Sequence, residues 1–267
     1  MRVHVVSDVH GDVEALARAG DGADALVVLG DLIEFVDYHD PTAGIVGRVL
    51  GPWVSAEFGR LRAAGAPGEL RRFIGQAWAR VPDAPTVVEQ AIREQYDRLF
   101  GALVAPTYAI PGNVDTPRLW PDYARPGLDL VDGQVVTIGG LRFGFVGGVP
   151  LPPGRTPWRP SQPGAAPWAP HLLAAEDFTA AVGRLSEVDV LCSHTPPAVP
   201  ELAFDVETRR PEASAPALLA RIRTDRPRAA LFGHVHQPLS ARVRVGRTEC
   251  VNVGHFRKTG RPYLLRW

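Results

Sequence analysis

The stretch Val3-His4-Val5-Val6-Ser7-Asp8-Val9-His10 joins a short β-prone run to a polar turn that carries a carboxylate and an imidazole. The same arrangement recurs at four later apolar runs, which cover residues 25–29, 107–110, 188–192 and 229–232. Near-continuous apolar strands are typical of sheets that are covered on both faces. Polar residues at the carboxyl ends of such strands are typical of an α/β binding site. The pattern therefore predicts an α/β fold with a site at one edge of its sheets.

Two regions depart from this alternation of strands and helices. Around residues 129–147 and 240–267, strand-like runs such as 134–138, 141–145 and 241–245 follow one another without strong helices between them. They predict hairpins that complete a mixed sheet.

A helix is expected over residues 13–19, directly after the first turn. We expect one domain over residues 1–267, since this length suffices for a single buried core.

The segment 35–104 is far longer than a crossover between strands requires. Within it, residues 70–81 and 85–103 have the apolar spacing of amphipathic helices. We interpret the segment as a helical insertion that forms a cap over the site or the surface of a homodimer. Residues 150–170 contain eight prolines, and we expect an extended loop there that takes no part in the core.

The composition excludes several classes of protein. Lys+Arg and Asp+Glu are both 29, so the net charge is zero and no global field attracts nucleic acid or an anionic membrane. No run of about 18 apolar residues is present, and the first residues lack the pattern of a signal peptide. Cys192 and Cys250 lie in apolar runs and are expected to be buried thiols. The expected location is the cytoplasm.

Taken singly, most of the polar turns have an ordinary structural explanation. Asp31 and Asn113 follow glycines and would usually be turn residues, and His194 would usually be a hydrogen-bonded histidine at a strand end. Asp8 and His10 alternate by two, which on an extended chain would point both side chains the same way. The strongest single motif is Gly233-His234-Val235-His236, because two histidines two residues apart after a glycine favour a metal.

The set as a whole is more specific than its members, because each candidate lies at the end of an apolar run. Seven oxygen and nitrogen ligands are too many for one ion that must also hold water, and they suit two ions that share a carboxylate. The predicted metal ligands are Asp8, His10, Asp31, Asn113, His194, His234 and His236.

These motifs in this order, with Gly112-Asn113-Val114-Asp115 as the third, resemble the signature of the calcineurin-like metallophosphoesterase superfamily. The resemblance implies a four-layer αββα sandwich with two mixed β-sheets. It implies one metal on Asp8, His10, Asp31 and His236, and a second on Asp31, Asn113, His194 and His234, with Asp31 bridging. It also implies hydrolysis of a phosphoric ester by a metal-bridging hydroxide. Manganese is the first choice of metal, and Fe, Zn, Co or Ni also suit these ligands.

One position departs from the pattern of most phosphatases in that superfamily, which carry a histidine where this chain has Val114. A general acid typically contributes about 10²–10⁴-fold, so its absence favours substrates with good leaving groups. Small members of the superfamily with Gly-Asn-x-Asp tend to be phosphodiesterases, and this resemblance implies a phosphodiester, for which we expect a nucleotide-type substrate. Asp115 either takes over a catalytic role or supports the site as a turn residue or a partner of a ligand. The alternatives are a phosphomonoesterase, including a protein phosphatase, and a metal-binding scaffold without physiological catalysis.

Four further residues are candidate contacts to a small-molecule phosphoester. His39 and His255 are candidates near the second and last motifs, and Arg155 and Arg159 are candidates on the proline-rich loop. For the two arginines, a solvated loop is the ordinary alternative. His171, beside that loop, is expected to face solvent.

Overall fold

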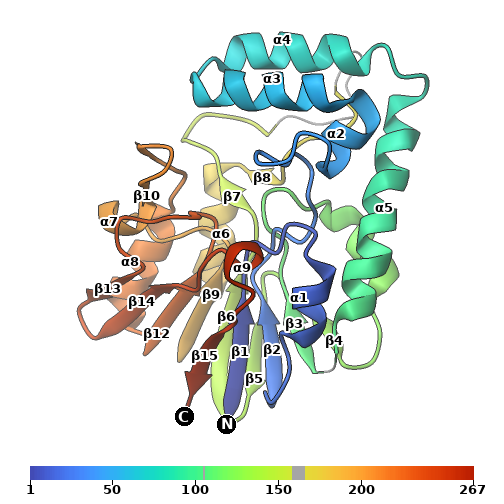
Figure 1. Cartoon of the computed structure of the whole chain (residues 1–267). Coiled ribbons are helices and arrows are strands. Elements are labelled where there is room, and N and C mark those ends of the chain that lie inside the picture. The colour runs from blue at the N-terminus through green and yellow to red at the C-terminus, as the bar shows by residue number, and fades with distance from the viewer. Residues whose placement is uncertain (105, 158–165) are drawn as a thin grey trace.

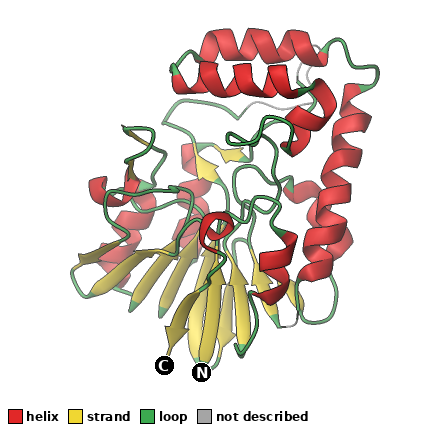
Figure 2. Cartoon of the chain, viewed as in Figure 1, coloured by secondary structure: helices red, strands yellow, loops and turns green. Residues whose placement is uncertain are grey.

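Two mixed β-sheets lie face to face at the centre of the computed structural model, which describes residues 1–104, 106–157 and 166–267 (Figures 1 and 2). The first sheet has the order β15-β1-β2-β3-β4, in which only β15 is antiparallel to its neighbour. Its strands are β1 (Arg2–Val6), β2 (Ala25–Val28), β3 (Thr107–Ala109), β4 (Leu128–Leu130) and β15 (Tyr263–Arg266).

The second sheet has the order β13-β14-β12-β9-β6-β5, with a parallel centre and an antiparallel strand at each edge. Its strands are β5 (Val135–Ile138), β6 (Leu141–Val146), β9 (Val190–Ser193), β12 (Ala229–Phe232), β13 (Arg242–Val245) and β14 (Thr248–Asn252). The predicted hairpins are present at both edges, because β5 pairs with β6 and β13 with β14.

Three apolar clusters define the layers of the fold. The central cluster joins the inner faces of the sheets and includes Val5 of β1 and Phe145 of β6. A second cluster packs α1 (Val13–Arg18) and α5 (Ala84–Ala102) on the outer face of the first sheet. A third packs α6 (Ala175–Arg184) and α8 (Pro216–Asp225) on the outer face of the second sheet. This order of helices, sheet, sheet and helices confirms the predicted αββα sandwich.

The segment between β2 and β3 contains two more helices than its sequence predicted. They are α2 (Gly44–Leu50) and α3 (Pro52–Ala63), which precede α4 (Pro67–Trp78) and α5. The helix predicted over 70–81 begins three residues earlier, because Pro67 suits a first helical turn. Helix α3 has no clear apolar face, and Trp53 at its start is 70% exposed. Figure 1 shows α3 and α4 side by side beyond the carboxyl ends of the strands.

The proline-rich segment takes more part in packing than we expected. It lies between β7 (Val149–Pro150) and β8 (Leu172–Leu173), which pair in parallel. Near its end, Trp168 stacks on Phe35 with ring centroids 3.9 Å apart and joins the apolar cluster around α5. The expectation that the whole segment stays outside the core is therefore wrong, because prolines prevent a regular helix but not aromatic stacking. Residues 158–165, with Arg159, lie outside the described residues.

The remaining elements are short and lie in the loops around the sheets. They are η1 (Pro117–Tyr123), α7 (Pro200–Ala203), β10 (Phe204–Asp205), β11 (Arg210–Pro211) and α9 (Phe256–Thr259). Cys192 and Cys250 are buried free thiols, as predicted. Within the described residues, no helix combines the length and the apolar character that crossing a membrane requires.

Candidate metal centre

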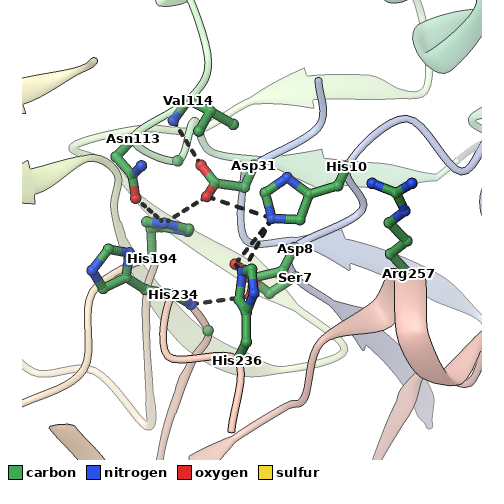
Figure 3. A network of polar contacts seen from close by, with 12 residues as sticks. Ser7, Asp8, His10, Asp31, Asn113, Val114, His194, His234, His236 and Arg257 are labelled. Atoms are coloured by element: carbon green, nitrogen blue, oxygen red, sulfur yellow. Dashed lines mark hydrogen bonds and ion pairs between the residues drawn. The ribbon is translucent and has the colours of Figure 1, made fainter. Parts of the chain in front are cut away.

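The seven predicted ligands meet where five strands of the two sheets end (Figure 3). Asp8 and His10 follow β1, Asp31 follows β2, Asn113 follows β3, His194 follows β9, and His234 and His236 follow β12. Nε2 of His10 lies 3.2 Å from Nε2 of His236, and Nε2 of His194 lies 3.1 Å from Oδ1 of Asn113. Side chains as far apart in the chain as those of His10 and His236 thus lie in one small volume.

The backbone at this site is not the extended chain that the spacing of Asp8 and His10 suggested. Asp8, His10, Asp31 and His234 have φ angles of 58°, 43°, 53° and 68°. A positive φ in a residue other than glycine is uncommon, and it concentrates at functional sites because the surroundings must compensate for its cost. The side chains of Asp8 and His10 face the same site because the backbone turns sharply after β1. The alternating direction of side chains along a strand is not the cause.

Asp31 occupies the middle of the site. The backbone N–H of Val114 donates to Oδ1 of Asp31 over 2.9 Å. Its other oxygen, Oδ2, lies 3.5 Å from Nε2 of His194 and 4.0 Å from Nε2 of His10. Two groups of potential ligand atoms, each within 4.8 Å, have Asp31 in common: one with Asp8 and His10, the other with His194 and His234.

The donor atoms of the other ligands are held facing the same volume. The N–H of His234 donates to Oδ2 of Asp8 over 3.0 Å, which leaves Oδ1 free to face inward. Nδ1 of His194 lies 2.8 Å from the carbonyl oxygen of Leu29. Since a carbonyl can only accept, Nδ1 carries a proton, and Nε2 is the ring nitrogen that faces the site.

Two of the inward-facing atoms support the presence of a cation. Oδ1 of Asp8 and Nε2 of His234 are buried and make no hydrogen bond within the described residues. A buried polar atom without a partner costs about 1–3 kcal/mol, so such atoms are rare unless an ion or water satisfies them. Carboxylate oxygens and imidazole nitrogens suit Mn, Fe, Zn and related divalent ions. The residues present therefore fit a divalent metal.

Burial and mutual charge shift the pKa values of these groups in opposite directions. Burial and neighbouring His194 lower the pKa of His234 to about 3. Burial and His236 likewise lower the pKa of His10. Burial would raise the pKa of Asp8, but the close approach of His236, whose Nε2 lies 3.4 Å from Oδ1, outweighs burial and holds the pKa below its usual value. His10 and His234 are therefore neutral near pH 7, as metal ligands must be.

His255 lies against the predicted ligands. Its ring stacks on that of His236 with centroids 4.0 Å apart, and it meets the ring of His10 edge-on at 5.6 Å. Burial and His236 lower its pKa to about 4. With His10 and His236 it forms a third group of nitrogen atoms that lie within 4.8 Å of one another.

The other predicted contacts have different surroundings. The side chains of His39 and Arg155 are exposed. The charge of His39 acts on the pKa of His255, so His39 lies on the same side of the molecule as the site. His171 does not face solvent as we expected: its Nε2 is buried, and its backbone N–H donates to the carbonyl oxygen of Asn113 over 2.7 Å. This hydrogen bond holds His171 against the loop that carries Asn113, a predicted ligand, and so connects the end of the proline-rich segment to the site.

Asp115 is buried beneath the ligands, with 1% of its surface exposed. Its carboxylate accepts from the N–H of Gly112 at 2.8 Å, the N–H of Leu32 at 3.1 Å and the hydroxyl of Tyr96 at 3.2 Å. Burial and the nearby charge of Asp31 raise its pKa to about 7. These bonds join the loop after β2 to the loop after β3.

Two arginines near the site could not be predicted from the sequence. The charge of Arg257 on α9 acts on His10, which lies beside it in Figure 3. The charge of Arg62 on α3 acts on His234. Arg62 donates to the hydroxyl of Tyr38 over 2.9 Å and accepts at its carbonyl oxygen from Arg210 of β11. No spacing in the sequence connects these arginines with the ligands, because only the packing of α3 and α9 brings them close.

Comparison with known proteins agrees with this geometry. The model of the calcineurin-like phosphoesterase family matches residues 1–238, which include all seven predicted ligands. No curated protein matches the chain in sequence. The fold is similar to the crystal structure of TT1561 of Thermus thermophilus, with 15% identity, a TM-score of 0.55 and coverage of 99% of this chain and 98% of that one. A further solved structure has 17% identity, a TM-score of 0.54 and the same coverage. The chain therefore belongs to the calcineurin-like phosphoesterase family.

Proposed function

We propose that this phosphoesterase hydrolyses phosphodiesters of the nucleotide type with two divalent metal ions. The observation that carries the proposal is the position of Asp31, whose carboxylate is common to two groups of ligand atoms. Asp8, His10, Asp31 and His236 would hold one ion, and Asp31, Asn113, His194 and His234 the other. The reaction consumes one water, breaks one P–O ester bond and yields an alcohol and a phosphomonoester.

A pair of divalent ions supplies Lewis acidity to a phosphate oxygen and lowers the pKa of water near the phosphorus. The protein's part is to hold the ligand atoms in place before substrate binds. The N–H groups of Val114 and His234 each fix one oxygen of a carboxylate and leave the other oxygen facing inward. Such preorganisation avoids a rearrangement during the reaction.

The side chain of Val114 favours diesters over alkyl monoesters. An isopropyl side chain cannot donate a proton, so position 114 cannot supply a general acid to protonate the leaving oxygen. Stabilisation of the departing oxygen would then fall to the metal pair. Manganese remains the predicted metal, and a homodimer through the insertion, where Trp53 is 70% exposed, stays a prediction.

With Mn²⁺, we expect the purified protein to hydrolyse bis-p-nitrophenyl phosphate with a higher kcat/KM than p-nitrophenyl phosphate. Both esters release the same leaving group, so the comparison isolates the preference for a diester. Release of p-nitrophenolate measures both rates, and chelator-treated protein is the control. A preference for the monoester would contradict the diesterase proposal. Fewer than about 0.5 metal ions per chain, with no turnover of either ester, would instead favour a scaffold.

We propose that Asp115 positions the loops that carry Asp31 and Asn113. Replacing Asp115 by Asn leaves one acceptor oxygen for the three donors that now bond to it. We expect kcat/KM to fall by about 10–100-fold, the usual effect of losing a partner of a metal ligand. The loss should be the same for bis-p-nitrophenyl phosphate and for a diester with a poorer leaving group, diphenyl phosphate. A much larger loss with diphenyl phosphate would instead identify Asp115 as the general acid.

A further inference from the structure

A small cavity opens beside the metal centre, on the side of His10 that faces Arg257. Its volume is about 200 Å³, and its walls include Glu34, Arg48, Gln95 and Arg98. At about 30 Å³ per water molecule, it has room for roughly seven waters. Pockets for entire small molecules are larger, typically about 300–1,000 Å³. The cavity is therefore the size of a subsite for one part of a substrate that also reaches the metal ligands.

Two arginines of this cavity have no acidic partner. Arg48 on α2 and Arg98 on α5 are exposed, and each donates through Nε to a carbonyl oxygen of its own helix, those of Gly44 and Glu94. Among the described residues, neither forms an ion pair with a carboxylate. Their terminal nitrogens therefore remain available to an anion.

The third arginine is compensated and has a different role. Arg257 pairs with Glu34 and Asp37, and Asp12 lies close enough to influence its pKa. Its backbone N–H donates to the carbonyl oxygen of Asp8 over 3.1 Å. Arg257 thus connects one wall of the cavity to the loop that carries the first metal ligands. Among the described residues that line the cavity, Glu34 is the one carboxylate and pairs with Arg257, so Arg48 and Arg98 supply the excess positive charge.

One wall of the cavity is held in place by buried hydrogen bonds. Gln95 of α5 is 4% exposed, and its side-chain amide makes two hydrogen bonds to the backbone of Glu34. Its oxygen accepts from the N–H of Glu34 at 2.8 Å, and its nitrogen donates to the carbonyl oxygen at 3.0 Å. Leu99, buried on the same helix, lines the cavity as well. This wall is therefore formed without a ligand.

We propose that this cavity binds a second, terminal phosphate group on the substrate, held by Arg48 and Arg98, while the scissile diester lies at the metal centre. The inference rests on the proposed diesterase function and extends it to a substrate class: nucleotide diesters that end in a phosphomonoester. Guanidinium groups bind phosphate through paired, charge-assisted hydrogen bonds. Both arginines come from helices between β2 and β3, so this segment selects the substrate.

The test compares the dinucleotide ApA with its 5′-phosphorylated form pApA, which differ only in the terminal phosphate. With Mn²⁺, we expect the wild-type KM to be at least about tenfold lower for pApA, since a charge-assisted hydrogen bond contributes about that factor or more. The double variant Arg48→Gln/Arg98→Gln should lose this preference and keep its KM for ApA within about twofold. The control is Arg72→Gln, an exposed arginine of α4 outside the cavity, which should behave like the wild type.

The outcomes separate this inference from the function on which it rests. If the wild type does not distinguish the two dinucleotides, or the double variant still does, the inference is overturned. Hydrolysis of bis-p-nitrophenyl phosphate in the same preparations tests the diesterase function independently. Calorimetric titration of metal-free protein gives a readout without turnover, in which pApA should bind more tightly than ApA. Equal binding of inorganic phosphate and pApA would overturn the inference in favour of a site for free phosphate.

Discussion

Replacing Asp31 by Asn is expected to abolish both metal binding and turnover. The substitution preserves the shape of the side chain but removes the charge common to both groups of ligand atoms. Losing a mere partner of a metal ligand costs about 10–100-fold, so loss of the shared ligand should exceed 100-fold. After manganese loading and dialysis, elemental analysis should find fewer than one ion per chain. Hydrolysis of bis-p-nitrophenyl phosphate measures the turnover.

The fold should survive this change, because burial and the nearby charge of Asp8 already raise the pKa of Asp31. Removing a buried charge that its surroundings disfavour does not destabilise a protein without metal. The thermal midpoint of the metal-free variant should therefore equal or exceed that of the wild type. Asp129→Asn, an exposed carboxylate on β4, is the matched control and should keep full activity. Activity of Asp31→Asn within tenfold of the wild type would show that Asp31 does not bridge two metals.

The second large effect is expected for Gly112→Ala, although glycine contributes no ligand. A Cβ atom at this position would lie 2.1 Å from Oδ1 of Asp31 and 2.3 Å from its backbone nitrogen. Both distances are far inside van der Waals contact, so the loops after β2 and β3 must separate. Overpacking of this kind costs about 1–3 kcal/mol of stability. A displacement of about 1 Å at a catalytic site can also lower the rate by about 10²-fold.

Urea unfolding followed by circular dichroism measures the first effect, and hydrolysis of bis-p-nitrophenyl phosphate the second. Gly75→Ala is the control, because nothing lies within 4 Å of a Cβ atom at that position in α4. There, alanine should stabilise the helix by about 0.5–1 kcal/mol and leave activity unchanged. If Gly112→Ala were as stable and active as the wild type, close packing of the two loops would not position Asp31.

The sequence alone was sufficient to predict the buried strands and the seven candidate ligands, because both depend on local patterns, and the resemblance carried by these motifs implied the sandwich. A buried strand is a short run of contiguous apolar residues, and a ligand is a residue type that follows such a run. The carboxyl ends of parallel strands lie at one edge of a sheet. Residues as distant as His10 and His236 could therefore be assigned to one site without any knowledge of their contacts.

The helices between β2 and β3 were predicted less well for the converse reason. Helix α3 packs against α2 and α4 and carries only Ser55 and Leu61 as buried residues, so its sequence shows no apolar face. Trp168 stacks on Phe35 from a proline-rich stretch whose composition excludes regular structure but says nothing about packing. In both cases the segment that packs against these residues lies elsewhere in the chain, and the local composition does not predict this contact.

The sequence by itself thus indicated the family, the layers of the fold and the chemical types of the candidate metal ligands. Only the tertiary structure decided how those ligands are oriented, through left-handed backbone at Asp8, His10, Asp31 and His234 and through the bonds of Asp115 to two loops. It alone brought Arg48 and Arg98 to the cavity beside His10. The physical reason is that the type of a ligand and the pattern of a strand depend only on residues that are neighbours in the sequence. The orientation of the ligands and the charge around a site depend on contacts between segments that lie far apart in the chain.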